Sequence, residues 1–309
     1  MLKYTLKRIL YMIPVLIGIS VLVFFILQLA PGDVTHLILG EDQSVEAVEQ
    51  LREELGLNDP VPVQYLHYMA KLVRGDFGTS YMTNTPVWDE LAARFPYTFK
   101  LAAAAAVVSI VLAIPLGILA AVKQNTLFDH LSMVVSLVGI SMPAFWLALV
   151  LVMQFSLKLG WFPMQGAEAG WRSYVLPAVT IGFMNMAAIA RTTRSSMLET
   201  LRQDYVRTAR AKGVNEYRII THHAFRNAML PTVTVIGMQI GALLGGAVLT
   251  ETVFAWPGIG RFLVQSISSR DIPCVMGCVL VLSFLGAVVT LITDLTYGII
   301  DPRVRTMYR

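Results

Sequence analysis

Long apolar runs constrain this chain more than any other feature of its sequence. Six runs occur, and they cover residues 9–30, 99–122, 131–157, 174–194, 230–253 and 275–300. The hydrocarbon core of a bilayer is about 30 Å thick, and an α-helix crosses it with about 20 residues. Since a lipid-exposed segment must satisfy its backbone polar groups internally, runs of this length predict helices. The sequence therefore predicts an all-α, polytopic membrane protein with six transmembrane helices.

The composition supports a membrane protein. Of the 309 residues, 56% are hydrophobic and only 14% are charged, whereas a soluble domain carries about 25% charged residues. The net charge of +4 does not indicate nucleic-acid binding, because the basic residues cluster beside the apolar runs. Cys274 and Cys278 lie four residues apart in an apolar run. This spacing is typical of neither a disulfide framework nor a metal site, so we expect both to pack in the interior.

The distribution of positive charge predicts the orientation. The two terminal tails and segments 123–130 and 191–229 hold 15 of the 24 Lys and Arg residues, whereas the short loops 158–173 and 254–274 hold four. Positive charge accumulates on the cytoplasmic side of membrane proteins. We therefore expect both termini in the cytoplasm. We also expect the first run to be a retained span, because "LQLAPGD" offers no cleavage site of a signal peptide.

The spans divide the chain into three parts: residues 1–30, an extracytoplasmic segment over 31–98, and a five-helix core over 99–309. The extracytoplasmic segment has eleven acidic and four basic residues. It contains an amphipathic pattern with Ser44 as the expected N-cap. The apolar positions of that pattern are Val45, Val48, Leu51 and Leu55. A second helix is expected to begin at "TPVWDELAARF", with Pro86 in its first turn. These features predict a small helical cap.

The sequence does not contain the common catalytic motifs. It has no G-x-x-x-x-G-K-[ST] phosphate-binding loop, no H-E-x-x-H and no G-x-S-x-G. We therefore expect no enzyme activity, no catalytic residue, and no bound metal or cofactor on this chain. Asp294 is the main charge within a span, and such a carboxylate is a functional candidate by default. We favour a structural ion pair with Arg191, Arg303 or Arg305. An ion-coupled carrier should show more ionisable groups near the midplane.

A stripe of small residues marks the fifth run. Gly237, Gly241 and Gly245 recur every four residues, a spacing that lets another helix approach closely. One interpretation is close packing alone. The other is that this helix lines a subunit interface or a translocation path, to which Gln239 would add a polar group.

The basic segment between the fourth and fifth runs is the main cytoplasmic feature. Residues 197–213 predict one amphipathic helix that ends at Gly213, a glycine suited to a C-terminal cap. The apolar face of this helix would hold Leu198, Leu201, Tyr205 and Ala209. A second short helix over about 215–228 would lead into the fifth span. This segment either lies on anionic lipid or docks on a protein, and its length favours docking.

At this segment the chain resembles the inner-membrane permeases of ATP-binding-cassette (ABC) importers. Their loop reads Glu-Ala-Ala, three residues, Gly, and later Ile-x-Leu-Pro. Here Arg207-Thr208-Ala209 and Gly213 match its first part, and residues 228–231, "AMLP", match its end. Arg207 replaces the Glu and Ala228 replaces the Ile, so contacts of that Glu do not transfer.

The resemblance to the dipeptide, oligopeptide and nickel permeases extends along almost the whole chain. It is carried by the stretches "APGD", "ELGLNDP", "GDFGTS", "SMPAFW", "RTTRSSMLE", "LTETVFAWPGIGR", "RDIP" and "DPRVR". The short N-terminal tail and the large first outer segment resemble the first of the two permeases in such systems. The resemblance implies the type I ABC importer permease fold in the inner membrane of a prokaryote.

The same resemblance implies partners and site residues. The partners would be a homologous second permease, an extracytoplasmic substrate-binding protein and two ATPase subunits, which would hold the ATP and Mg²⁺. Residues 213–218 would form the coupling helix, and Arg207 and Arg210 would pair with acidic groups of an ATPase. The full set implied for the coupling loop is Arg207, Thr208, Ala209, Arg210, Gly213, Val214, Asn215, Glu216, Tyr217, Arg218, Leu230 and Pro231.

The substrate class expected from the resemblance is di- or oligopeptides, with nickel or glutathione as alternatives. Two other classes of function remain. One is an ion-coupled secondary transporter or channel, which the uncharged midplanes and the cytoplasmic segment disfavour. The other is a membrane subunit that only anchors a complex, with which the glycine stripe is compatible.

Overall fold

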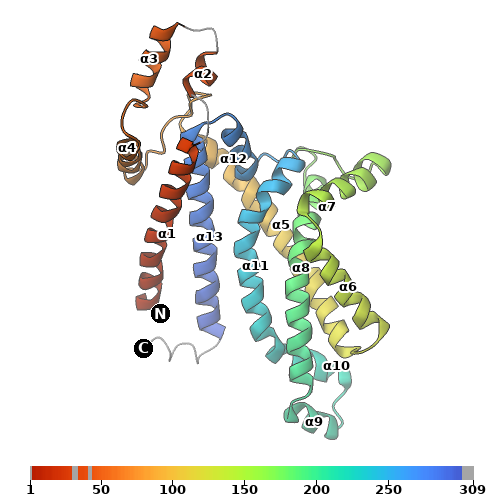
Figure 1. Ribbon diagram of the computed structural model, residues 1–309. Helices are drawn as coiled ribbons and strands as arrows, with labels where there is room; N and C mark the ends of the chain where they lie inside the picture. The colour runs from red at the N-terminus through yellow and green to blue at the C-terminus, as the bar shows by residue number, and fades with distance from the viewer. Residues whose placement is uncertain (1, 30–33, 41–43, 301–309) are drawn as a thin grey trace. The chain divides into compact units, whose positions relative to one another are not determined.

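A computed structural model of the chain describes residues 2–29, 34–40 and 44–300. Its elements are helical, apart from one isolated antiparallel bridge between Thr79 and Pro86. Figure 1 shows the helices in chain order. Their bounds are α1 Leu2–Leu29, α2 Val34–Leu39, α3 Val45–Glu54, α4 Val61–Val73, α5 Val87–Val122, α6 Leu127–Ser141, α7 Ala144–Leu151, the π-helix η1 Val152–Lys158, α8 Trp171–Leu201, α9 Asp204–Ala211, α10 Glu216–Arg218, the π-helix η2 Ile219–Ala224, α11 Phe225–Val253, α12 Ile259–Ser268 and α13 Ile272–Ile300.

The described helices account for six membrane spans when each bent pair counts as one. Four continuous helical stretches are long and apolar enough to cross a bilayer, and they are Thr5–Leu29, Val87–Val122, Trp171–Leu201 and Ile272–Thr293. Two further stretches qualify as pairs, Leu127–Ser141 with Ala144–Lys158, bent by 107°, and Glu216–Leu243 with Ala247–Val253, bent by 50°. On this count the all-α, six-span prediction is confirmed.

The third apolar run forms two helices joined by a sharp bend and not one continuous helix. The run breaks between α6 and α7 at Met142 and Pro143. Met142 has an extended backbone, with φ −77° and ψ 131°. Proline disfavours the helical conformation in the residue before it and has no N–H to donate. The motif "SMPAFW" therefore encodes a sharp bend.

The outer segment joins the second span without a break. The helix expected at "TPVWDELAARF" and the span expected over 99–122 are one helix of 36 residues, α5. Pro86 directly precedes this helix, in keeping with its expected place at the start. The predicted part boundary at residue 98 therefore lies inside α5.

The chain forms two compact units. Among the described residues, unit 1 contains 2–5, 99–256 and 286–300, and unit 2 contains 6–29, 34–40, 44–98 and 257–285. In unit 2, Val87 and Leu91 of α5 pack with Ile259, Cys274 and Cys278. Both cysteines are free and buried, so the expectation of interior packing is confirmed.

The helix expected near residue 45 is also present in unit 2. The Ser44 side chain accepts a hydrogen bond from the Ala47 N–H at 3.3 Å, as an N-cap does. Val45 is nevertheless 80% exposed, and none of the residues of α3 is fully buried.

Two motifs of the sequence meet in unit 2. Asp271 of "RDIP" is only 2% exposed, and Ser80 of "GDFGTS" donates its hydroxyl proton to Asp271 Oδ2 at 2.5 Å. The Tyr81 N–H and the Cys274 N–H both donate to Asp271 Oδ1, at 3.3 and 3.4 Å. Asp271 therefore caps the start of α13 and fastens the 79–86 loop to it.

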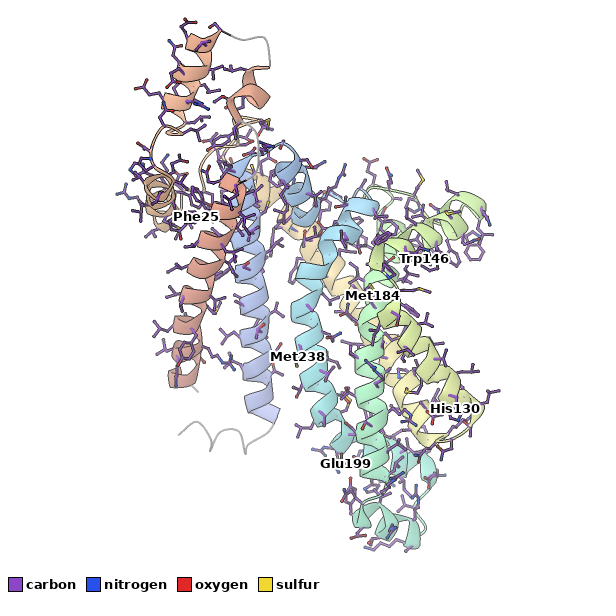
Figure 2. The ribbon with its side chains drawn as sticks, viewed as in Figure 1. Phe25, His130, Trp146, Met184, Glu199 and Met238 are labelled. Carbon is purple, nitrogen blue, oxygen red and sulfur yellow. The ribbon has the colours of Figure 1, made fainter. Side chains whose placement is uncertain are left out.

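Small residues let the helices of unit 1 approach closely. A Cβ at Gly117 of α5 would meet the Ala190 carbonyl oxygen of α8 at 2.7 Å, and one at Gly182 of α8 would meet Val108 at 2.8 Å. Apolar side chains such as Trp146 on α7 and Met238 on α11 remain exposed (Figure 2). Exposed apolar surface of this kind is expected of helices that face lipid.

Candidate functional site

The candidate site is the segment that joins α8 to α11, residues 202–224, which we call the elbow (Figure 1). The single helix expected over 197–213 is not present. α8 ends at Leu201, and α9 begins at Asp204 after Gln203, whose backbone is extended with ψ 149°. Asp204 lies in the first turn of α9, where negative charge complements the helix dipole.

This break divides the predicted apolar face between two cores. Leu198 and Leu201 pack against a cluster that includes Met197 and Ala224. Ala209 instead packs with Val206 and Ile219, which are fully buried, and with the half-buried Val214. The elbow therefore has a small core of its own. Sequence reasoning missed Val206 and Ile219, although the three-residue spacing of Val206 and Ala209 is a helical signal.

Gly213 caps α9 as predicted. Its φ of +75° lies in the left-handed region. The Gly213 N–H donates to the Arg210 carbonyl at 2.9 Å, and the Val214 N–H donates to the Ala209 carbonyl at 3.2 Å. These two bonds form a Schellman motif, for which glycine is the preferred residue. A Cβ at this position would meet no atom within 4 Å, so the requirement for glycine is conformational.

The second helix begins directly after this cap. The Asn215 side chain accepts a hydrogen bond from the Tyr217 N–H at 2.8 Å and caps α10. α10, η2 and α11 then follow one another to Val253, so the expected short helix 215–228 continues into the fifth span. Leu230 and Pro231 lie inside α11 and do not interrupt it.

Two of the predicted site residues are paired within the elbow. Arg210 donates to both carboxylate oxygens of Glu216, from Nε at 3.2 Å and from Nη2 at 2.6 Å. This bond raises the pKa of the Arg210 guanidinium above its usual value. It also ties the end of α9 to the start of α10. Arg210 is therefore occupied within the chain, which weakens the expectation that it pairs with an ATPase.

Other predicted residues of the elbow face solvent. Tyr217 is 76% exposed, and the Arg207 side chain lies 3.9 Å from Asp204, both groups being exposed. Thr208 donates its hydroxyl proton to the Asp204 carbonyl at 2.9 Å, a bond along the same helix. The outward surface of the elbow thus presents a guanidinium from α9 and an aromatic ring from α10.

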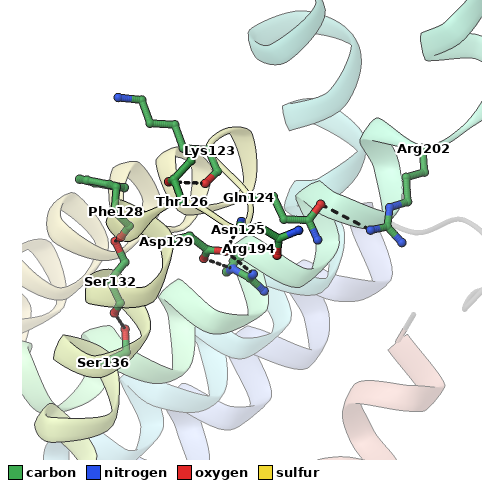
Figure 3. Close-up of polar contacts among 10 residues, drawn as sticks. All are labelled: Lys123, Gln124, Asn125, Thr126, Phe128, Asp129, Ser132, Ser136, Arg194 and Arg202. Carbon is green, nitrogen blue, oxygen red and sulfur yellow. Dashed lines mark hydrogen bonds and ion pairs between the residues drawn. The ribbon is translucent and has the colours of Figure 1, made fainter.

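An ion pair that the sequence analysis did not identify lies beside the elbow (Figure 3). Asp129, in the first turn of α6, is 2% exposed. Arg194 of α8 donates to its two carboxylate oxygens, from Nε at 2.6 Å and from Nη2 at 2.7 Å. The available signal was that Asp129 is the only acidic residue of segment 123–130.

The glycine stripe contacts a helix of the same chain. A Cβ at Gly237 would overlap the Thr293 side chain of α13, and one at Gly241 would lie 3.5 Å from Thr290 Oγ1. At Gly245 a Cβ would meet nothing within 4 Å. These contacts support close packing at the first two positions.

Gln239 and Asp294 are the remaining predicted residues. Gln239 donates from Nε2 to Asn185 Oδ1 of α8 at 3.0 Å. Asp294 lies on α13, but its side chain is outside the described part of the structure, as are Arg303 and Arg305. Within the described residues, no group of three or more His, Cys, Asp or Glu side chains could hold a metal ion.

Comparisons with known proteins cover both ends of the chain. Residues 113–306 match the family described as binding-protein-dependent transport system inner membrane component, and residues 1–102 match the N-terminal region of the same kind of component. The chain is 43% identical to the dipeptide transport system permease protein DppB of Alkalihalophilus pseudofirmus, over 99% of this chain and 100% of that protein. It is also 43% identical to the glutathione transport system permease protein GsiC of Escherichia coli, over 99% of each chain.

Solved structures show the same fold. The MetNI methionine ABC transporter, in an inward-facing conformation, matches with a TM-score of 0.58 and 17% identity, over 69% of this chain and 96% of that chain. An amino acid ABC transporter matches with a TM-score of 0.52 and 14% identity, over 70% of this chain and 94% of that chain. The predicted fold class, that of ABC importer permeases, is confirmed.

Proposed function

Because the chain belongs to the family of inner membrane components of binding-protein-dependent transport systems, we propose that it is a permease subunit that imports short peptides, driven by ATP hydrolysis on partner subunits. The observation that carries this proposal is the elbow. It combines its own buried core, a Schellman cap and an internal ion pair with an exposed aromatic ring and guanidinium. Such a rigid projection suits protein docking better than a flexible lipid anchor.

The elbow is placed where it can move the helices of unit 1. It is continuous with α8 on one side and with α11 on the other. α8 and α11 pack along each other, and the Gln239–Asn185 hydrogen bond joins them at 3.0 Å. A displacement of the elbow by closing ATPase subunits would therefore act on both helices. In this proposal residues 213–218 contact an ATPase, and a homologous second permease completes the path.

Peptides are the substrate class that the relatives support best. A dipeptide permease and a glutathione permease are equally similar to this chain, at 43% identity over almost its full length. Glutathione is itself a tripeptide, so both names indicate short peptides. Nickel, the other substrate that the sequence resemblance allowed, has no support from these two relatives. The matched family, described as binding-protein-dependent, supports a substrate-binding protein as the partner on the extracytoplasmic side. The placement of both termini of this chain in the cytoplasm rests on the distribution of positive charge in the sequence.

Reconstitution tests the proposal. The chain is assembled in vesicles with its second permease, its ATPases and its binding protein, and uptake of a radiolabelled dipeptide or glutathione is measured with and without enclosed ATP. ATP-dependent uptake is expected. Uptake by this chain alone down an ion gradient would instead show a secondary transporter.

Substitution of Gly213 tests the role of the elbow. A β-branched residue in the left-handed region costs at least about 1–2 kcal/mol, so Gly213→Val should distort the cap and uncouple ATP hydrolysis from uptake. Gly213→Asn is the matched control, because asparagine tolerates this backbone conformation. Unchanged ATP-dependent uptake by an inserted, assembled Gly213→Val variant would contradict the assignment.

A further inference from the structure

The ion pair between Asp129 and Arg194 is geometrically complete. Besides the two bonds from Arg194, Asp129 Oδ2 accepts a hydrogen bond from the Asn125 N–H at 3.0 Å. The Asp129 carboxylate therefore accepts three hydrogen bonds, two from the Arg194 guanidinium and one from a backbone N–H (Figure 3). A bidentate arginine–carboxylate pair fixes both the distance and the relative orientation of its two groups. The pair thus holds the first turn of α6 against α8 in one defined geometry.

A second contact joins the same two parts of unit 1. The short turn between α5 and α6 carries Gln124, whose Oε1 accepts a hydrogen bond from Arg202 Nη2 at 3.4 Å. Arg202 is the C-cap residue that directly follows α8, where the elbow begins. We call these two contacts, Asp129–Arg194 and Gln124–Arg202, the α6–α8 clamp. Both contacts of the clamp lie toward the C-terminal end of α8, next to the elbow.

The clamp continues into close packing along α6. The buried residues of this helix are Asp129, Ser132, Ser136 and Gly139, which recur every three or four residues. They therefore form one narrow face of small or polar side chains. A Cβ at Gly139 would lie 3.2 Å from the Phe183 carbonyl oxygen of α8. α6 consequently lies close against α8 over about ten residues beyond the ion pair.

Stability alone does not account for an ion pair whose carboxylate is buried and whose arginine side chain is 23% exposed. The desolvation of two charges offsets most of their attraction, and apolar residues of similar volume often stabilise a protein as well or better. A bidentate pair does supply a fixed orientation between two helices. We propose that Asp129 and Arg194 are positioning residues that make α6 and α8 move together as one rigid body, which we call the lever. Displacement of the elbow then reaches α6 and, across the Met142–Pro143 bend, α7. This inference rests on the proposed transport function.

A neutral double variant separates this role from folding. Asp129→Asn alone would leave a partly buried guanidinium without its carboxylate and is expected to impair assembly. Asp129→Asn with Arg194→Gln removes both charges and leaves a polar side chain at each position. We expect the double variant to insert and to hydrolyse ATP, and its transport per ATP hydrolysed to fall about tenfold, within the 5–150-fold range of typical coupling between sites. Glu168→Gln, at an exposed carboxylate in the loop before α8, is the control and should change nothing.

The outcomes distinguish the lever from the transport function itself. If the wild-type complex shows no ATP-dependent peptide uptake, the proposed function fails. If the wild type transports and the assembled double variant keeps the wild-type ratio of transport to hydrolysis, the lever is overturned. Arg194→Lys is a second test of the lever by the same ratio of transport to hydrolysis, because lysine keeps the charge but cannot form the two-point contact. An intermediate coupling ratio is expected, and a wild-type ratio argues against the lever.

A distance measurement keeps the test independent of whether the double variant assembles. Spin labels are attached at His130→Cys, near the start of α6, and at Glu199→Cys, near the end of α8 (Figure 2). Both positions are exposed, whereas the native Cys274 and Cys278 are buried. The distance between the labels is compared in the resting and the ATP-trapped complex. A lever predicts an unchanged distance, and a change of about 5 Å, one helical turn, would overturn the proposal.

Discussion

The hydrogen bonds of the buried Asp271 carboxylate should make this residue important for the stability of unit 2. The carboxylate is 2% exposed and accepts from the Ser80 hydroxyl at 2.5 Å and, at longer range, from two backbone N–H groups. A hydrogen bond to a charged group contributes about 1.5–3 kcal/mol, and removal of one partner leaves the other buried and unsatisfied. Asp271→Ala should therefore lower the free energy of unfolding by about 3–4 kcal/mol. Ser80→Ala should lower it by at least about 1.5–3 kcal/mol, because it removes the bond to Asp271 and also the oxygen that accepts from the Met82 and Thr83 N–H groups.

A double-mutant cycle measures the interaction itself. The two single variants and the double variant are purified in the same detergent, and their unfolding is followed by circular dichroism. The two substitutions should be non-additive by about 1.5–3 kcal/mol, because each removes the same bond. Asp89→Ala, an exposed carboxylate in the first turn of α5, is the control and should cost less than about 1 kcal/mol. Additivity within about 0.5 kcal/mol would refute a stabilising Ser80–Asp271 hydrogen bond.

The remaining predictions concern unit 1. Arg210→Glu should uncouple transport from ATP hydrolysis, because it places two acidic side chains side by side. Arg210→Glu with Glu216→Arg should restore part of the coupling. Uptake per ATP hydrolysed in vesicles measures both variants, and an equal loss in the two would contradict a role for the Arg210–Glu216 pair. Gly237→Val should reduce the amount of folded protein in the membrane, because its side chain would overlap Thr293. Gly245→Ala should have no such effect, since a Cβ there meets nothing within 4 Å. Quantitative immunoblotting of membranes compares the two, and equal amounts would argue against the α11–α13 contact.

The number of spans followed from the sequence, but the shape of two of them did not. An apolar run predicts a helix because the bilayer imposes internal hydrogen bonding. It does not predict the angle at a proline. The run 131–157 contains Pro143, and local sterics allow either a kinked helix or a break. The 107° bend between α6 and α7 is the outcome found in the structure.

In the elbow, too, the sequence predicts some features correctly and others wrongly, and the difference can be followed residue by residue. The prediction that Gly213 and Ser44 cap helices rests on local chemistry alone, and it is confirmed at both positions. The apolar face expected across residues 198–209 was wrong, because the chain turns at Gln203 and sends the two halves of that face into different cores. The preference for a helical period is weak compared with the gain from burying Val206 and Ile219 together.

What the sequence determined by itself was local or compositional: the membrane class, the number of spans, the caps and the motifs of the family. Each of these depends on residues close together in the chain. The contacts between distant residues were decided only by the tertiary structure. Ser80 meets Asp271, and Asp129 meets Arg194, across 191 and 65 residues. Such pairs are required by burial, because a polar group removed from water must form a hydrogen bond within the protein. The fold decides which distant residue supplies the partner.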